Sequence, residues 1–538
     1  MGKAAYILQS LSRGLLQHCA PIMATLLGSL GIGFLVTVVL FFVYSYVQDK
    51  RRNPGGLPYP PGPKGYPIIG NLFDIPSVFI YKRFREMSRE LNSDIIHLQV
   101  FGFHLIACNS KGVADDLLDQ RSSIYSDRPR MPMIVELMGF GWSLGFTPYN
   151  EWWKHSRQLF HKHFQPSAVP HFRPKNLKAA HGFLQRLLDS PEHFHEHMQL
   201  MAGSTILNIA YGLDIRTSDD PYLKRAEECL QILDTAANPG TFLVDIMPAL
   251  KYVPEWVPGA SFKRKAREWR DVAERSYTIP FDFVKQSMTG GTAQSSFTSL
   301  ALRDITENDD RKYQEELIKC LGGTMYTAGT DMTVSLLLTF FLAMLTNPVA
   351  QDRAQEEIDR AVGTDRLPTF DDEPNLPFVS AMSKEVFRWQ QVAPFAIPHR
   401  LMEDDVYNGY FLPKNSIVLG NAWAILHDDR LFPDPFTFKP ERFTDPNVDP
   451  RVPAAVDYAF GFGQRVCPGR WMAHSLVFIV VASVLSTFRI ERAVRDGRVI
   501  EPSGAYTPGI LASPEKFECT IKPRSREAEA LVRATATS

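Results

Sequence analysis

The stretch FGFGQRVCPGR at residues 460–470, followed by the apolar run RWMAHSLVFIVVASVLSTF, constrains the fold of this chain most. The run predicts a buried helix over 468–487. Pro468 suits the first helical position, where its missing N–H would have no partner within the helix. Cys467 is therefore expected at the N-terminus of a core helix, where unpaired N–H groups and the helix dipole stabilise a thiolate.

The residues around Cys467 favour the close approach of a flat ligand. Gly461, Gly463 and Gly469 remove side chains beside the backbone, and Arg465 offers a cation to an anionic group. A thiolate below a flat ligand with a cation at its edge describes an axial cysteine on haem iron. The alternative is a buried structural cysteine with incidental glycines.

The same stretch resembles the motif F-x-x-G-x-R-x-C-x-G of the cytochrome P450 haem-thiolate monooxygenases, which it matches at Phe460, Gly463, Arg465, Cys467 and Gly469. The resemblance covers about residues 58–519. It implies a mainly α fold with smaller β-sheets, and a haem b whose iron is bound by the Cys467 thiolate.

Two further motifs support the resemblance. KEVFR (384–388) places Glu385 and Arg388 at i, i+3 on one helix face, and PERF (440–443) adds Arg442. A single E-x-x-R is commonly a solvated ion pair. In the family these three residues form a buried network that holds the loop under the haem, and the resemblance implies the same role here.

Cations are also expected around the haem carboxylates. EWWKHSR contains W-x-x-x-R as Trp153 and Arg157, and PHR provides His399. The resemblance assigns these residues, with Arg465, to the haem propionates. A core aromatic and a surface histidine are the alternatives for Trp153 and His399.

The stretch YTAGTDMTVS interrupts a long apolar helix with polar residues. It resembles the family pattern A/G-G-x-D/E-T-T/S at Ala328, Gly329 and Asp331. The resemblance implies that Gly329 lets the helix widen into a groove for dioxygen and that Asp331 relays protons. A solvent-reaching aspartate is the alternative.

Met332 occupies the position where the family places a threonine hydroxyl, and a thioether has no proton to donate. Thr333 and Thr330 are rotated by about 100° and about 200° along the helix, so neither takes over the same direction. We expect a water or a substrate hydroxyl to replace the missing donor.

Residues 21–48 carry no charge and are long enough to span a bilayer, and they precede the basic cluster Lys50-Arg51-Arg52. A cleaved signal peptide is the alternative. The expected organisation is a lead (1–20), a transmembrane anchor (21–48), a basic, proline-rich hinge (49–67), a catalytic domain (68–525) and a polar tail (526–538).

Periodicity predicts a strand pair near 95–107 and a polar surface loop over 287–299. The expected helices cover roughly 150–165, 172–212, 221–236, 262–288, 313–346, 348–362, 376–391 and 468–487. The pocket walls that the resemblance implies are 131–146, 242–250, 324–328, 392–397 and 506–511, which are mostly apolar.

The resemblance implies insertion of one oxygen atom from O2 into a C–H bond of a lipophilic molecule. The absence of a flavin or Rossmann motif implies electrons from NADPH through a separate reductase, with cytochrome b5 as a further candidate partner. The anchor predicts a single-pass protein of the endoplasmic reticulum with a cytosolic catalytic domain. A net charge of -1 gives no global attraction to nucleic acid.

The region 387–418 looks like that of fungal members that modify terpenoids or polycyclic secondary metabolites. Two alternatives remain open: a peroxide-using haem-thiolate isomerase or peroxygenase that needs no reductase, and a haem-binding membrane protein without turnover.

Overall fold

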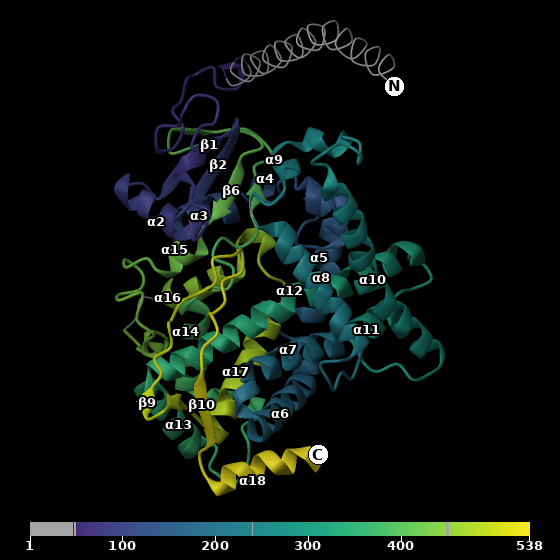
Figure 1. Cartoon of the computed structure of the whole chain (residues 1–538), viewed down its shortest axis with the longest axis vertical. Helices are drawn as coiled ribbons and strands as arrows, with labels where there is room; N and C mark the ends of the chain where they lie inside the picture. Colours follow the sequence, from purple (N-terminus) through teal and green to yellow (C-terminus); the bar gives the residue numbers. More distant parts are fainter. Residues whose placement is uncertain (1–46, 48–49, 239, 448–450, 538) are drawn as a thin grey trace, which may run out of the picture.

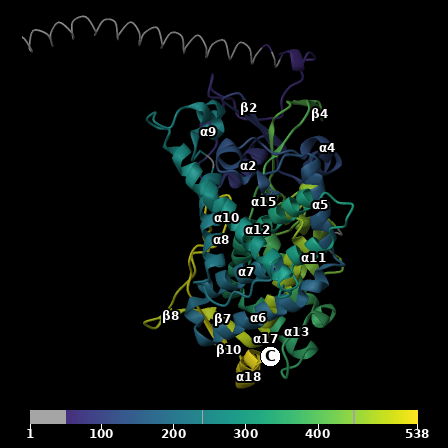
Figure 2. The ribbon, with the colours of Figure 1, turned by 90° about the vertical axis from the view of Figure 1, so that its right-hand side faces the viewer.

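The computed structural model describes residue 47 and residues 50–238, 240–447 and 451–537. The predicted lead and nearly all of the predicted anchor lie outside these residues. The described chain is mainly helical with small sheets, as predicted (Figure 1). The four-stranded sheet and the C-terminal helix lie at opposite ends of the molecule (Figures 1 and 2).

Twelve longer helices build the body of the described part. They are α2 (Ile80–Glu90), α5 (Glu151–Phe164), α6 (Arg173–Asp189), α7 (Phe194–Tyr211), α8 (Pro221–Ala237), α10 (Ser261–Thr289), α11 (Phe297–Arg303), α12 (Arg311–Thr346), α13 (Pro348–Ala361), α14 (Pro377–Trp389), α17 (Arg470–Thr487) and α18 (Arg526–Ala534). Shorter helices are α3 (Lys111–Ala114), α4 (Ser122–Tyr125), α9 (Leu243–Ile246), α15 (Ala422–Leu426) and α16 (Arg451–Ala455).

The main sheet has the order β1-β2-β6-β3, with β1 and β2 antiparallel and β2 and β6 parallel. Its strands are β1 (Ile95–Val100), β2 (Phe103–Cys108), β6 (Ile417–Gly420) and β3 (His399–Arg400). The two-stranded sheets pair β4 (Asp405–Tyr407) with β5 (Tyr410–Leu412), β7 (Phe488–Arg492) with β10 (Cys519–Pro523), and β8 (Val494–Arg495) with β9 (Arg498–Val499). The strand pair predicted at 95–107 is therefore confirmed.

Two of the predicted boundaries are corrected by the fold. The single helix expected over 172–212 is two helices, because Pro191 lies in the break between α6 and α7. The loop expected over 287–299 ends sooner: Ser296 caps α11, which starts at Phe297 and is buried at its first residue. Polar composition alone did not show that this segment turns back into the core.

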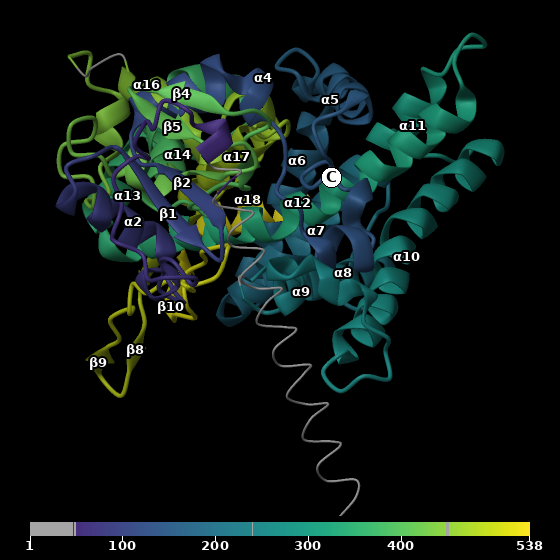
Figure 3. The ribbon, with the colours of Figure 1, turned by 90° about the horizontal axis from the view of Figure 1, so that it is seen from above.

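Helix α12 crosses the centre of the molecule, between the sheet and the α10–α11 region (Figure 3). Asp310 caps its start by accepting from the Tyr313 N–H at 3.1 Å. Helices α12 and α17 are both long and apolar enough to cross a membrane, but most of each is buried in the protein. They are core helices that pack against each other.

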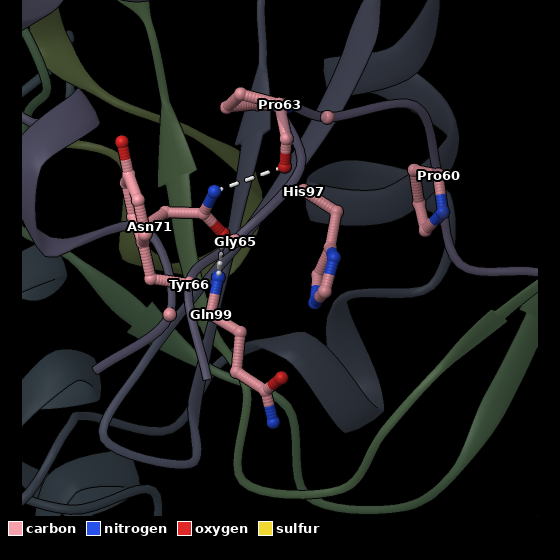
Figure 4. Close-up of a pocket in the computed structure, with 9 residues that line it drawn as sticks. Pro60, Pro63, Gly65, Tyr66, Asn71, His97 and Gln99 are labelled. Atoms are coloured by element: carbon pink, nitrogen blue, oxygen red, sulfur yellow. Dashed lines mark hydrogen bonds between the residues drawn. The ribbon is translucent and has the colours of Figure 1, made fainter. Parts of the chain in front are cut away.

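Part of the segment predicted as a hinge is docked on the catalytic body. The Phe411 N–H donates to the Pro58 carbonyl at 2.8 Å, and the His97 N–H to the Pro61 carbonyl at 2.9 Å. Asn71 closes the segment by donating to the Pro63 carbonyl and accepting from the Gln99 N–H, both at 2.9 Å (Figure 4). Pro63, Asn71, His97 and Gln99 border a surface pocket of about 250 Å³. The stretch therefore contacts β5 at Pro58 and β1 at Pro61.

The predicted polar tail contains an ordered amphipathic helix. Ser525 caps α18 by accepting from the Ala528 N–H at 3.1 Å, and α18 buries Ala528 and Val532. It packs against α6, where Gln185 donates to the Thr535 hydroxyl at 2.8 Å. The tail is polar on one face only.

Candidate active site

Cys467 closes the loop that precedes α17. Its backbone N–H donates to the Phe460 carbonyl at 2.7 Å, which returns the chain on itself. Helix α17 starts at Arg470 with Gly469 as its N-cap. Pro468 is therefore not the first helical residue, and Cys467 lies just before the helix rather than in its first turn. The expectation of a helix beginning at 468 needs this correction.

The environment of the free Cys467 thiol does not hold it as a thiolate. Burial raises the pKa of Cys467, and the Gly469 N–H and the cations of Arg157 and Arg470 lower it only in part. The helix N-terminus alone thus fails to do what the sequence suggested. A coordinated metal ion would deprotonate the thiol outright.

Of the three glycines near Cys467, Gly463 is required by the protein's own packing. Gly463 has φ +51°, and a Cβ there would lie 1.9 Å from the Leu118 carbonyl oxygen. Gly461 has φ +90°, where side chains are rarely tolerated. A Cβ at Gly469 would make ordinary contact with Cys467 Sγ at 3.8 Å. We expected a ligand to approach the backbone at Gly463, but the 115–120 segment of the protein approaches it instead.

Arg465 is buried and aimed by backbone carbonyls. Its guanidinium donates to the carbonyls of Ser126 at 2.7 Å, Thr147 at 2.9 Å and Leu144 at 3.4 Å. The same guanidinium lies over the Trp153 ring, 4.3 Å from its centroid. The indole N–H of Trp153 makes no hydrogen bond within the described part of the chain. The structure thus brings together two of the predicted propionate residues.

Two more arginines complete a cationic cluster, which we call the arginine cluster: the buried Arg128 and Arg465, and the half-buried Arg157. Burial lowers the pKa of Arg157 to about 10 and that of Arg465 to about 9, and lowers that of Arg128 well below its usual value. Among the described residues, none of the three forms an ion pair. Burying unpaired charge is costly, so this cluster is suited to an anion.

Arg128 was missed by sequence reasoning. It donates to the carbonyls of Gly145, Ile397 and Pro398 at 2.8 to 2.9 Å. The sequence did contain a signal, the short run DRPR at residues 127–130. It holds two arginines and a single acidic residue, Asp127.

His399, in β3, lies beside the arginine cluster, and one of its ring nitrogens is already hydrogen-bonded. Nδ1 donates to the Tyr125 carbonyl at 2.8 Å, so a neutral His399 can only accept at Nε2. Burial, Arg128 and Arg465 all lower its pKa. In this state His399 cannot donate to a carboxylate, which qualifies the propionate role that the resemblance implied.

The three residues of the predicted network lie in contact. Arg388 binds Glu385 through two nitrogens at 2.7 and 2.8 Å, and both side chains are fully buried. Arg442, from the 440–443 turn, lies 3.5 Å from the same carboxylate. Arg388 also donates to the carbonyls of Leu426, Pro435 and Thr437. The Lys439 N–H donates to Glu385 at 2.8 Å.

Between residues 320 and 345, α12 is accessible only around the polar motif. Its residues are buried on both sides of 327–332, whereas Ala328 and Asp331 are exposed. Burial and the carboxylate of Asp234 on α8 raise the pKa of Asp331, and Asp331 in turn helps burial to raise the pKa of Glu227, also on α8. Although its side chain meets solvent, its environment is therefore acidic and partly desolvated. This combination favours a carboxyl group that holds a proton.

The two threonines of the motif do not point free hydroxyls outward. Thr330 donates to the Tyr326 carbonyl at 3.3 Å and Thr333 to the Gly329 carbonyl at 2.7 Å, each back along the helix. Met332 is half-buried between them. Neither hydroxyl occupies the Met332 direction, as the helix geometry predicted.

Gly329 has a packing role that differs from the predicted one. A Cβ there would lie 2.9 Å from Cδ1 of Ile206 on α7, and α12 continues as a regular α-helix through this position. Gly329 is required because α7 and α12 pack closely here.

The donor set fits haem bound through one cysteine. Within the described residues no group of three or more His, Cys, Asp or Glu side chains could hold a metal ion by itself. Cys467 would therefore be a single protein ligand to a metal carried by a cofactor. A cofactor with carboxylates would also supply the anions that the arginine cluster lacks.

Comparisons with known proteins agree with this geometry. The cytochrome P450 family profile matches residues 60–520. The cytochrome P450 monooxygenase COX2 of Coprinopsis cinerea is 41% identical over 92% of this chain and 94% of its own. The tryptamine 4-monooxygenase of Psilocybe cyanescens is 39% identical over 92% and 98%, and cytochrome P450 monooxygenase 98 of Postia placenta is 40% identical over 95% and 99%. This chain therefore belongs to the cytochrome P450 family.

Proposed function

We propose that this protein is a haem-thiolate monooxygenase that inserts one oxygen atom from O2 into a C–H bond of a lipophilic small molecule. The observation that carries the proposal is Cys467 close to Arg157, within an arginine cluster that forms no ion pair among the described residues. Cys467 would bind the haem iron, and the arginine cluster would hold the haem carboxylates. When bound, the haem supplies dioxygen activation.

The substrate proposal rests on apolar walls. Residues of the 131–146 loop, including Met133 and Phe140, pack in one cluster with Val244 and Phe242. Val392 and Leu511 pack with Met332 in a second cluster. Such walls suit a lipophilic substrate, and we propose a terpenoid or polycyclic secondary metabolite. Tryptamine, named for one relative, is the comparison substrate in the test.

Proton delivery is proposed to run through Asp331. Its exposure and raised pKa support a carboxyl group that picks up a proton from solvent and passes it inward. Because Met332 cannot donate and both neighbouring threonine hydroxyls are bonded to helix carbonyls, an ordered water or a substrate hydroxyl would complete the relay.

Electrons are proposed to come from NADPH through a separate reductase, with cytochrome b5 as a second donor. Three basic residues of the 150s helix and the loop around Cys467, Lys154, Lys162 and Arg470, are candidates for this contact, but they differ in exposure. Lys154 and Lys162 are at the surface in ion pairs with Glu151 and Asp304, whereas Arg470 is half-buried over Trp471. Only the two lysines remain candidates for a docking surface.

Attachment to the cytosolic face of the endoplasmic reticulum is also proposed. The predicted anchor supports it, and so do large exposed side chains that include Phe73, Tyr252 and Trp256, at 75%, 76% and 83% exposure. Phe73 follows the docked segment, and the other two follow α9. Both regions lie at the sheet end of the molecule (Figure 1).

The test uses the full chain in membranes with haem and a reductase. Reduced protein is exposed to carbon monoxide, and the spectrum should show a thiolate-ligated haem that Cys467→Ala abolishes. Product formation from terpenoid, polycyclic and tryptamine substrates is then followed with NADPH and O2. Turnover with an organic hydroperoxide but never with NADPH and reductase would instead establish the peroxide-using alternative. Binding of haem without any product would establish the non-catalytic one.

A further inference from the structure

The arginine cluster is held in place by three chain segments that are far apart in sequence: 124–128, 144–149 and 397–400. Arg465 binds carbonyls of Ser126, Leu144 and Thr147, in the first two. Arg128, itself in the first segment, binds Gly145 in the second and Ile397 and Pro398 in the third. The directions of both guanidinium groups thus depend on how these segments are fixed to one another.

Asp127 joins all three segments. Its Oδ1 accepts from the Tyr149 N–H at 2.8 Å, and its Oδ2 accepts from Arg400 Nε at 3.0 Å and from Arg400 Nη2. Its carbonyl accepts from the Arg400 N–H at 2.9 Å. Asp127 is only 3% exposed, whereas the Arg400 side chain is partly exposed.

The charge of Asp127 also reaches the cluster. The Asp127 carboxylate raises the pKa of both Arg128 and Arg465, whereas the charge of Arg465 lowers the pKa of Arg128. Its direct ion pair, however, is with Arg400. The single negative charge of Asp127 therefore pairs with Arg400 and neutralises the positive charge of the arginine cluster only in part. The remaining positive charge can bind an anionic ligand.

We infer that Asp127 is a positioning residue: it clamps the three segments so that Arg128 and Arg465 face the haem carboxylates, and it sets the net charge beside them. The inference rests on the proposed haem binding. It concerns a side chain that does not touch the cofactor and acts through its neighbours.

The test compares Asp127→Asn with a matched control, Asp372→Asn. Asp372 is also buried, at 7% exposure. It binds an arginine, Arg366, at 2.6 and 2.7 Å and accepts from the Thr369 N–H at 2.8 Å. It lies in the connection between α13 and α14, outside the three segments. Both variants lose one buried carboxylate charge and keep similar shape.

Two readouts are measured on haem-loaded protein: the rate of haem transfer to apomyoglobin and the ferric/ferrous reduction potential. Asp127→Asn should release haem about tenfold faster or more and shift the potential in the positive direction, because a negative charge near the haem is lost. Asp372→Asn should change neither. Asp127→Glu, which keeps the charge, should restore the potential.

Equal effects of Asp127→Asn and Asp372→Asn on haem release, or an unchanged potential in Asp127→Asn, would overturn the inference. If Asp127→Asn does not fold, Arg400→Gln takes its place. It should also speed haem release but move the potential in the negative direction, and an unchanged potential there overturns the inference equally. Wild-type protein that shows no haem spectrum would instead refute the proposed function.

Discussion

Two buried charged groups in this protein are built in opposite ways. In the network of Glu385, Arg388 and Arg442, a carboxylate meets two guanidinium groups, and backbone carbonyls accept the remaining N–H groups. In the arginine cluster, carbonyls orient the guanidinium groups of Arg128 and Arg465, and no acidic side chain in the described part of the chain forms an ion pair with either.

The difference separates a structural role from a binding role. A buried ion network that is satisfied within the chain stabilises the fold in all states of the protein, and loses that value if one member is removed. A cation that is oriented but unpaired weakens the empty protein and gains its partner only from a ligand. Predictions about the two groups should therefore differ in whether haem is needed to see the effect.

The largest effect is expected at the satisfied network. Glu385→Gln leaves Arg388 buried without its carboxylate, and should cost about 3–5 kcal/mol of unfolding free energy. The loss should appear in chemical denaturation of haem-free and haem-loaded protein alike. Glu441→Gln, which removes an exposed ion pair with Arg353, is the control and should cost about 0–1 kcal/mol. Equal losses would show that the network has no special role.

The arginine cluster should give the opposite pattern. Arg157 makes no hydrogen bond or ion pair within the described part of the chain, and burial lowers its pKa to about 10. Arg157→Gln should therefore raise the melting temperature of haem-free protein while it speeds haem loss about 10- to 100-fold. The two measurements are thermal unfolding of the apoprotein and haem transfer. Destabilisation of the apoprotein would mean that the cation is already satisfied.

In α12, the threonine hydroxyls beside Met332 are already hydrogen-bonded to helix carbonyls, and Met332 itself has no hydroxyl. Met332→Thr supplies a hydroxyl in a direction that Thr330 and Thr333 do not reach. The share of NADPH electrons that ends in product should rise several-fold, or the product pattern should change, when hydrogen peroxide and product are measured together. Thr333→Ser, which keeps the bond to the Gly329 carbonyl, is the control. Unchanged coupling and products in Met332→Thr would remove any role for this position in proton supply.

The smallest expected effect is a pH-dependent gain in stability at Asp331. Burial and Asp234 raise the pKa of Asp331 in the folded chain, while the unfolded chain keeps the ordinary value near ~3.9. Ionised Asp331 therefore destabilises the folded state above its raised pKa, and this cost disappears as the pH falls below the ordinary value. Asp331→Asn should melt higher than wild type at neutral pH, with a difference that shrinks on acidification.

A pH-independent difference for Asp331→Asn would contradict this account, since only a titrating carboxyl produces the slope. Asp371→Asn, at an exposed aspartate away from α8 and α12, offers the comparison.

Much of the site was readable in advance because its motifs are local. The loop around Cys467, the i, i+3 pair of Glu385 and Arg388, and Met332 in the threonine position are all properties of short stretches, and the mainly helical fold follows from periodicity. The site residues remain predictions until the haem complex is measured. The local sequence pattern did not show which group would occupy the space beside each glycine. Gly329 and Gly463 were expected to make room for ligands, yet their missing side chains admit Ile206 and the Leu118 carbonyl.

The sequence by itself therefore determined which chemistry this chain carries: one cysteine in a haem-binding motif, a carboxylate at Asp331, and no hydroxyl at position 332. Only the tertiary structure decided which charges are paired. Arg128 and Asp127 are adjacent in sequence, but Asp127 binds Arg400 and Tyr149 while Arg128 turns to the carbonyls of Gly145, Ile397 and Pro398. Pairing depends on contacts between segments hundreds of residues apart, and burial sets their strength, so neither can be read from local sequence.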